Sequence, residues 1–233
     1  MVKKISLMFS GGIDSTMTAV LLAKKYDEIH LLTYNNGYGH MFMNTVQKRV
    51  NELNSMFDNK FEYSLMSTKD LFEKIIVNNV VNEVKTHKSG FVWCLGCKYA
   101  MHAKSIIYNK KNNILEMTDG SSKSTKDMVE QKPFSVKIIK HLYKNHGIKF
   151  HTPVYNIPRE ESIKKLKKLK FNMGWFRVLD RFIGIQPKCF AGEIYYMPNL
   201  VFGKTPKHDN KEIYKFYLRK QNILEECIKN GML

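Results

Sequence analysis

The sequence predicts an α/β fold, a doubly wound parallel sheet with a basic, mainly helical C-terminal extension. Short apolar segments alternate with segments of helical periodicity through the first half of the chain. A glycine-rich turn directly follows the first apolar segment, and the last third of the chain is rich in lysine and aromatic residues. We therefore expect an α/β domain over residues 1–155 and the extension over residues 156–233.

The alternating segments give the expected elements in order. The expected strands are the apolar segments 5–9, 28–34, 61–66, 114–117 and 150–155. The expected helices are the periodic segments 17–25, 46–57, 68–80, 98–109 and 157–169. Such a β-α-β-α order implies a parallel sheet with helices on both faces.

The turn between the first strand and the first helix reads Ser10-Gly11-Gly12-Ile13-Asp14-Ser15-Thr16. Paired glycines let the backbone approach an anion closely, and a helix start adds free amides with a favourable dipole. Ser10, Ser15 and Thr16 add hydroxyl groups. The turn lacks the Gly-Lys-Ser/Thr ending of a Walker P-loop. It predicts a phosphate-binding turn, with a serine-capped structural turn as the plain alternative.

This turn resembles the SGGxDS signature of the PP-loop ATP pyrophosphatases, which cleave ATP between the α and β phosphates. The resemblance implies ATP contacts for Ser10, Gly11, Gly12, Asp14, Ser15, Thr16, Thr33 and Gly120. It implies catalytic contacts with Mg²⁺ or ATP for Asp14 and Asp119, and with phosphate for Lys98. Relatives often carry an asparagine and paired acidic residues after the glycine, where this chain has serines. A simple Asp-Gly turn at Asp119 and a solvated Lys98 stay open.

The cysteines form the second chemical feature. Cys94 and Cys97 make a CxxC pair before an expected helix, and Cys189 follows 92 residues after Cys97. A helix start is expected to lower their pKa values and favour thiolates. PP-loop tRNA thiolases hold a [4Fe-4S] cluster with such a pair and one distant cysteine, so the resemblance implies a cluster at Cys94, Cys97 and Cys189. A zinc site completed by His87, His102 or His208, a persulfide or redox pair, and unrelated buried thiols are the alternatives. Cys227 is expected in the core.

The charge predicts a polyanionic partner. Lys and Arg total 38 against 21 Asp and Glu, a net charge of +17, which favours nucleic acid through counterion release. The lysines between residues 164 and 170 could contact an RNA backbone, and Trp175, Tyr195 and Tyr196 could stack on unpaired bases. A solvated helix face and core aromatics are the alternatives. The lack of a long apolar segment, an export signal or a disulfide pattern predicts a cytoplasmic protein without a membrane partner.

Together these features predict ATP-dependent adenylation of a substrate carbonyl with pyrophosphate release, followed by sulfur transfer, most simply tRNA base thiolation. A sulfur donor is implied, and a homodimer is open. One alternative is a PP-loop ligase acting on a small molecule, similar to the synthase that makes cyanodeazaguanine, although the four clustered cysteines of that family are lacking. The other is a non-catalytic nucleotide- or RNA-binding relative.

Overall fold

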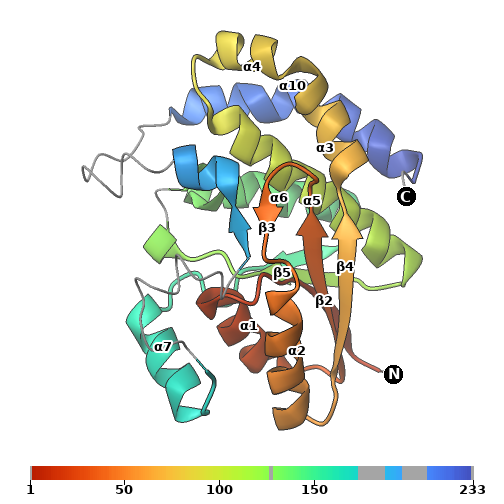
Figure 1. The fold of residues 1–233 in the computed structure, drawn as a ribbon. Helices are drawn as coiled ribbons and strands as arrows, with labels where there is room; N and C mark the ends of the chain where they lie inside the picture. Colours follow the sequence, from red (N-terminus) through yellow and green to blue (C-terminus); the bar gives the residue numbers. More distant parts are fainter. Residues whose placement is uncertain (1, 126–127, 173–186, 196–208, 232–233) are drawn as a thin grey trace.

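Five parallel strands form a single sheet in the order β4-β2-β1-β5-β6, with helices on both faces (Figure 1). The computed structural model describes residues 2–125, 128–172, 187–195 and 209–231. The strands are β1 (Lys4–Met8), β2 (Glu28–Asn35), β4 (Phe61–Ser67), β5 (Glu116–Asp119) and β6 (Lys149–His151). The predicted doubly wound sheet is confirmed. None of the helices within these ranges is both long and apolar enough to cross a bilayer.

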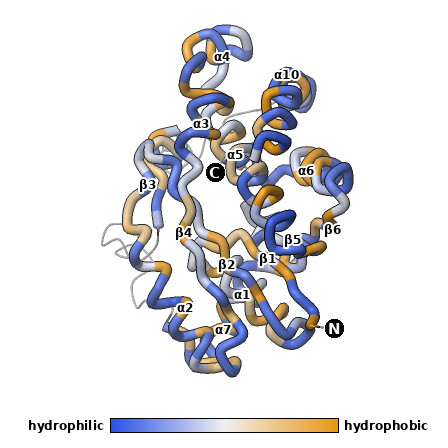
Figure 2. The backbone as a smooth tube through the Cα atoms, turned by 90° about the vertical axis from the view of Figure 1, so that its right-hand side faces the viewer, coloured by the Kyte–Doolittle hydropathy of each residue, from blue (hydrophilic) through white to orange (hydrophobic). Residues whose placement is uncertain are grey.

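The helices build two hydrophobic cores, one on each face of the sheet. The first core contains α1 (Ile13–Ala23), α2 (Thr45–Met56) and α7 (Arg159–Lys168). The second contains α3 (Lys69–Ile75), α5 (Phe91–Lys111), α6 (Pro133–Asn145) and α10 (Asn210–Lys229). Ile5 and Leu7 of β1 face the first core and Met8 the second, as strand alternation requires. Hydrophobic and hydrophilic residues alternate along α10, which packs against α5 (Figure 2).

The helix that carries the CxxC pair begins at Phe91, seven residues before the expected start at Lys98. The expectation of a loop around the two cysteines was therefore wrong. Phe91, Val92 and Leu95 recur at helical spacing and are buried. Gly96 serves a close contact within this helix, because a Cβ there would lie 1.9 Å from Cγ1 of Ile76.

The expected helix over 68–80 is interrupted. It is divided into α3, the 3-10 turn η1 (Val77–Asn79) and α4 (Val80–His87), which packs beside α5. The two remaining 3-10 turns of the described chain are η2 (Lys123–Thr125) and η3 (Val129–Gln131). Both lie between β5 and α6 along the chain.

A small second sheet was not predicted from the sequence. It pairs β3 (His40–Met41) with β7 (Lys188–Cys189) in antiparallel register, and His40 lies opposite Cys189. Strands of two residues have too little pattern to be recognised in a sequence. The pairing is important because it fixes Cys189, from the last fifth of the chain, beside the carboxyl end of β2.

Candidate functional site

The candidate site lies at the point where the strand order of the sheet reverses. From the central strand β1 the chain moves outward to β2 and β4, and it later returns to add β5 and β6 on the other side. In open α/β sheets the loops at such a point separate and leave a crevice for a ligand. The loop after β1 holds the glycine turn, and the loop after β5 holds Gly120. The two loops touch, since a Cβ on Gly120 would lie 2.7 Å from the backbone nitrogen of Ser15.

The glycine turn leaves donors at the start of α1. Gly11 has φ +71°, a left-handed conformation that glycine adopts readily. Gly12 is the N-cap of α1 and offers no side chain to the first helical amides, so these amides are open to an anion. The Oγ atoms of Ser10 and Ser15 are 3.2 Å apart, while the Thr16 hydroxyl donates to the Gly11 carbonyl oxygen at 3.3 Å. This geometry suits a phosphate.

Two carboxylates flank the turn in different environments. Burial raises the pKa of Asp14, and Arg159 at 3.5 Å offsets part of the rise. Burial would also raise the pKa of Asp119, but Lys98 and Ser121 outweigh it and hold that pKa below its ordinary value. Lys98 Nζ lies 3.1 Å from Asp119 Oδ2, and Ser121 donates to both carboxylate oxygens. Asp119 is thus an anion held in place by Lys98 and Ser121. The anionic form of Asp14 has less support and would be stabilised more by a bound cation.

The glycine turn and both carboxylates line one cavity of about 370 Å³, the loop cavity. Lys98 and Thr33 also line it, although the Thr33 hydroxyl donates to the Phe9 carbonyl oxygen at 2.6 Å. Arg159 enters the cavity from the first turn of α7. The sequence indicated a helix start at Pro158 but gave no sign of this role for Arg159. The contact joins Arg159 to Asp14, which lies 145 residues earlier in the chain.

Cys94, Cys97 and Cys189 line a second cavity of about 360 Å³, the cysteine cavity. The first two lie in the first and second turns of α5, and β7 supplies the third. The loop cavity and the cysteine cavity adjoin, since Lys98, Lys188 and Cys189 line both. The structure therefore brings the three predicted cysteines to one cavity beside the phosphate-binding turn.

The expected lowering of the thiol pKa values was wrong. Burial raises the pKa of Cys94 and Cys189, and it raises that of Cys97 to about 12. The apolar surroundings in the interior outweigh the dipole of α5. As free groups the three thiols are protonated at neutral pH, and thiolates form there when a bound metal displaces the protons.

The residues around the cysteine cavity fit a metal centre. Three sulfur ligands suit iron–sulfur clusters and zinc. Glu130 Oε2 and Trp93 Nε1 are buried at the cavity, and neither has a hydrogen-bond partner in the described structure. A tetrahedral zinc with three sulfur ligands would bring the sulfurs to about 3.8 Å from one another. Within the described ranges, one ligand atom each from Glu28, His30 and Glu62 lies within 4.8 Å of the other two. The three cysteine sulfurs do not lie this close together. The three sulfurs are therefore farther apart than a tetrahedral zinc would hold them.

The histidines considered as a fourth zinc ligand lie elsewhere or outside the described residues. His87 bonds to Glu212 at 3.1 Å. His102 bonds to Tyr143 at 3.0 Å, and burial lowers its pKa to about 3. Neither lines the cysteine cavity, whereas His40 does, with Nε2 3.9 Å from Cys97 Sγ. His208 lies outside the described residues.

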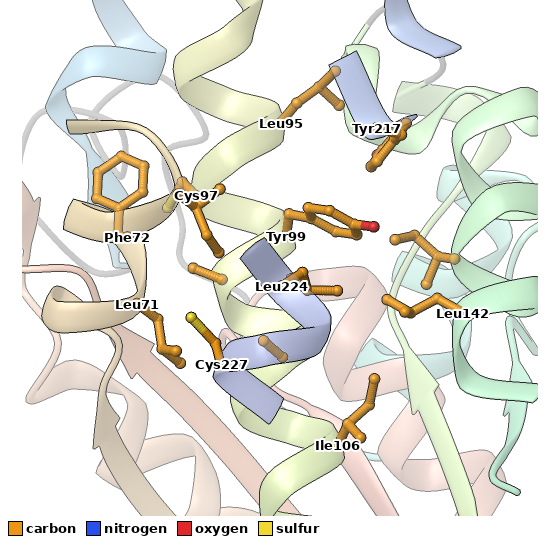
Figure 3. Packing of buried hydrophobic residues seen from close by; sticks show 14 of the residues in the cluster. Leu71, Phe72, Leu95, Cys97, Tyr99, Ile106, Leu142, Tyr217, Leu224 and Cys227 are labelled. Atoms are coloured by element: carbon orange, nitrogen blue, oxygen red, sulfur yellow. The ribbon is translucent and has the colours of Figure 1, made fainter. Parts of the chain in front are cut away.

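Three aromatic residues were expected to stack on bases, and the fourth cysteine, Cys227, was expected in the core. Trp175 and Tyr196 lie outside the described residues, and Tyr195 bonds to the Ser89 hydroxyl at 3.1 Å. Cys227 packs in the core between α10 and α3, as expected (Figure 3). It is 3% exposed, so it takes no part in either cavity.

A doubly wound sheet whose first strand ends in SGGxDS at the reversal point defines the PP-loop ATP pyrophosphatases. A sequence profile of the family described as "Queuosine biosynthesis protein QueC" matches residues 4–176. The chain belongs to this family. The match confirms the PP-loop class and an enzyme of ATP-dependent adenylation with sulfur or nitrogen transfer.

One solved structure shares the fold at low sequence identity, and a second is similar over part of its chain. A 4-thiouridine synthetase in complex with RNA and bound ATP is 14% identical, with a TM-score of 0.56. The alignment covers 98% of this chain and 53% of that one, so the chain spans about half the length of the synthetase. A predicted subunit of a tRNA methyltransferase from Methanocaldococcus jannaschii is 18% identical over 71% of this chain and 75% of that one, with a TM-score of 0.46.

Arg159→Ala is expected to weaken ATP binding about tenfold or more, because a charged hydrogen bond to phosphate is worth about 1.5–3 kcal/mol. Isothermal titration calorimetry with Mg-ATP measures the change. Lys165→Ala is the matched control, since Lys165 lies on the same helix, exposed and paired with Glu161. Equal affinities for the two variants would contradict a role for Arg159 in the loop cavity.

Proposed function

We propose that the protein adenylates a carbonyl oxygen of a tRNA base with ATP and then replaces that oxygen with sulfur held at Cys94, Cys97 and Cys189. The observation that carries the proposal is the continuity of the two cavities through Lys98, Lys188 and Cys189. A phosphate-binding turn and three thiols that line adjoining cavities support activation and sulfur transfer in succession.

In the first step the substrate carbonyl oxygen attacks the α phosphate, and the bond to pyrophosphate breaks. The open amides of α1 with Ser10 and Ser15 hold the phosphates, and Arg159 faces the negative charge that builds up on pyrophosphate. Mg²⁺ would bind at Asp14 and Asp119 and neutralise the phosphate oxygens. The reaction needs positioning and charge neutralisation rather than a protein nucleophile.

In the second step a sulfur nucleophile attacks the adenylated carbon. The new carbon–sulfur bond forms as the carbon–oxygen bond breaks, and its electron pair leaves with AMP. An iron–sulfur cluster held by the three cysteines would supply a binding place for the sulfide that a donor delivers. Lys98 stands between the two cavities and can neutralise the departing AMP phosphate while Asp119 holds it in place.

Anaerobically purified protein is expected to contain about four irons per chain and to absorb near 400 nm. Cys94→Ser, Cys97→Ser and Cys189→Ser should each lose most of the iron, because each removes one of three anchoring thiolates. Cys227→Ser is the control and should keep it, since Cys227 is a core residue. Iron analysis measures the loss. Zinc without iron in the wild-type protein would disprove the cluster.

An exposed basic surface on α7 supports an RNA partner. Lys164, Lys167 and Lys168 are exposed, as are Lys165 and Lys170. The same helix begins with Arg159 in the loop cavity. Nine residues of helix span about 14 Å, so a backbone bound along these lysines could present a neighbouring base to the cavity. The net charge of +17 favours such a partner.

Replacing Lys164, Lys167 and Lys168 together with Gln is expected to weaken tRNA binding and to reduce the slope of log affinity against log salt by about 2 to 3. Fluorescence anisotropy at several salt concentrations measures both. The control replaces Lys137, Lys140 and Lys144 of α6, which packs on the opposite face of the sheet. Unchanged affinity and slope in the α7 variant would remove the support for RNA.

The second candidate is a ligase for a small deazaguanine-type substrate, and the match to a queuosine biosynthesis family favours it. The adenylation step and the loop cavity would be the same, with a nitrogen or sulfur nucleophile in the second step. This candidate assigns no role to the lysines of α7. The lysine replacement therefore separates the two functions, because a small-molecule ligase would keep full activity in that variant.

A further inference from the structure

Glu130 carries a buried carboxylate oxygen that its contacts leave unexplained. The residue lies in η3, and its Oε2 atom is buried without a hydrogen-bond partner in the described structure. Buried polar atoms almost always have a partner, and an exception calls for an explanation such as a bound ion. Leaving such an atom unpaired is unfavourable, because it has lost its hydrogen bonds to water and gained none in the protein. Glu130 lines the cysteine cavity, so the missing partner belongs there.

The carboxyl group shares a cavity with all three cysteines. Glu130 lines the cysteine cavity together with Cys94 and Cys97 of α5 and Cys189 of β7. Three cysteines can anchor a four-iron cluster at three corners. The fourth corner would then need a ligand other than these thiolates, and Glu130 supplies an oxygen ligand in the same cavity.

His40 is another residue of the cysteine cavity that could bind a metal through an atom other than sulfur, and its contacts indicate a different role. Its Nδ1 is within 3.1 Å of the Tyr34 carbonyl oxygen and 3.3 Å of the Asn36 backbone nitrogen. Its Nε2 is 3.9 Å from Cys97 Sγ, a contact that suits a hydrogen bond to the same sulfur. His40 therefore has partners on both ring nitrogens and supports Cys97, whereas Glu130 Oε2 has none.

We propose that Glu130 is the fourth, replaceable protein ligand of the metal centre anchored by Cys94, Cys97 and Cys189. The proposal rests on the iron–sulfur centre of the proposed function. A carboxylate is a harder and weaker ligand for such iron than a thiolate. It can fill the fourth position at rest and give way to hydrosulfide, one anion replacing another with no change in oxidation state. Glu130 would thereby protect the site when sulfur is absent.

The test measures hydrosulfide binding to the anaerobically reconstituted protein. Glu130→Gln keeps the size of the side chain but removes the competing anionic ligand. The iron content of this variant should equal that of the wild type, and its Kd for hydrosulfide should be at least tenfold lower. Hydrosulfide is added as sodium hydrosulfide, and electron paramagnetic resonance of the reduced protein measures its binding. The apparent Kd of the wild type equals the intrinsic Kd divided by the fraction of sites that the carboxylate leaves open, so it is raised when the carboxylate fills most of them. His40→Gln is the matched control, and ATP binding reports correct folding of both variants.

A Kd in Glu130→Gln within twofold of the wild-type value would overturn the proposal, as would an equal fall in His40→Gln. A loss of iron in Glu130→Gln with ATP binding intact would overturn it too, because it would make Glu130 an anchor rather than a replaceable ligand. Wild-type protein that takes up no iron would instead refute the iron–sulfur part of the proposed function. These results are distinguishable in the same set of samples.

Discussion

The contact between the loops after β1 and β5 is the constraint on which the rest of the site depends. The strand order reverses between these two strands, and Gly120 packs directly on the backbone of Ser15. Because a side chain at Gly120 would collide with the first turn of α1, the glycine keeps Asp119 beside the phosphate-binding turn. The pair of Lys98 and Asp119 then ties the cysteine helix α5 to the same point.

The second constraint is the small sheet of β3 and β7. It joins a loop at the carboxyl end of β2 to a segment almost 150 residues later, and it carries Cys189 to the two cysteines of α5. The phosphate-binding turn and the three thiols are thus held by separate elements that meet at one edge of the sheet. An enzyme that activates a substrate with ATP and then passes it to a sulfur nucleophile needs this arrangement, since the activated carbon must not meet water in between.

Much of this arrangement was predictable from local patterns, and the rest was not. Ser10–Thr16 revealed the turn because a two-glycine segment between a strand and a helix has few other uses. Glu130 and Arg159 were missed, since their roles arise from residues distant in the chain. The prediction of reactive thiols failed because it weighed the helix dipole and could not see the burial around Cys97. Local sequence indicates chemical groups, but their environment depends on tertiary contacts.

The proposed function depends on cleavage of ATP between the α and β phosphates to activate an acceptor. Incubation of the anaerobic protein with tRNA, sodium hydrosulfide and ATP labelled at the α or the γ phosphate tests this cleavage most directly. The α label is expected in AMP and the γ label in pyrophosphate. Formation of ADP and inorganic phosphate would contradict it.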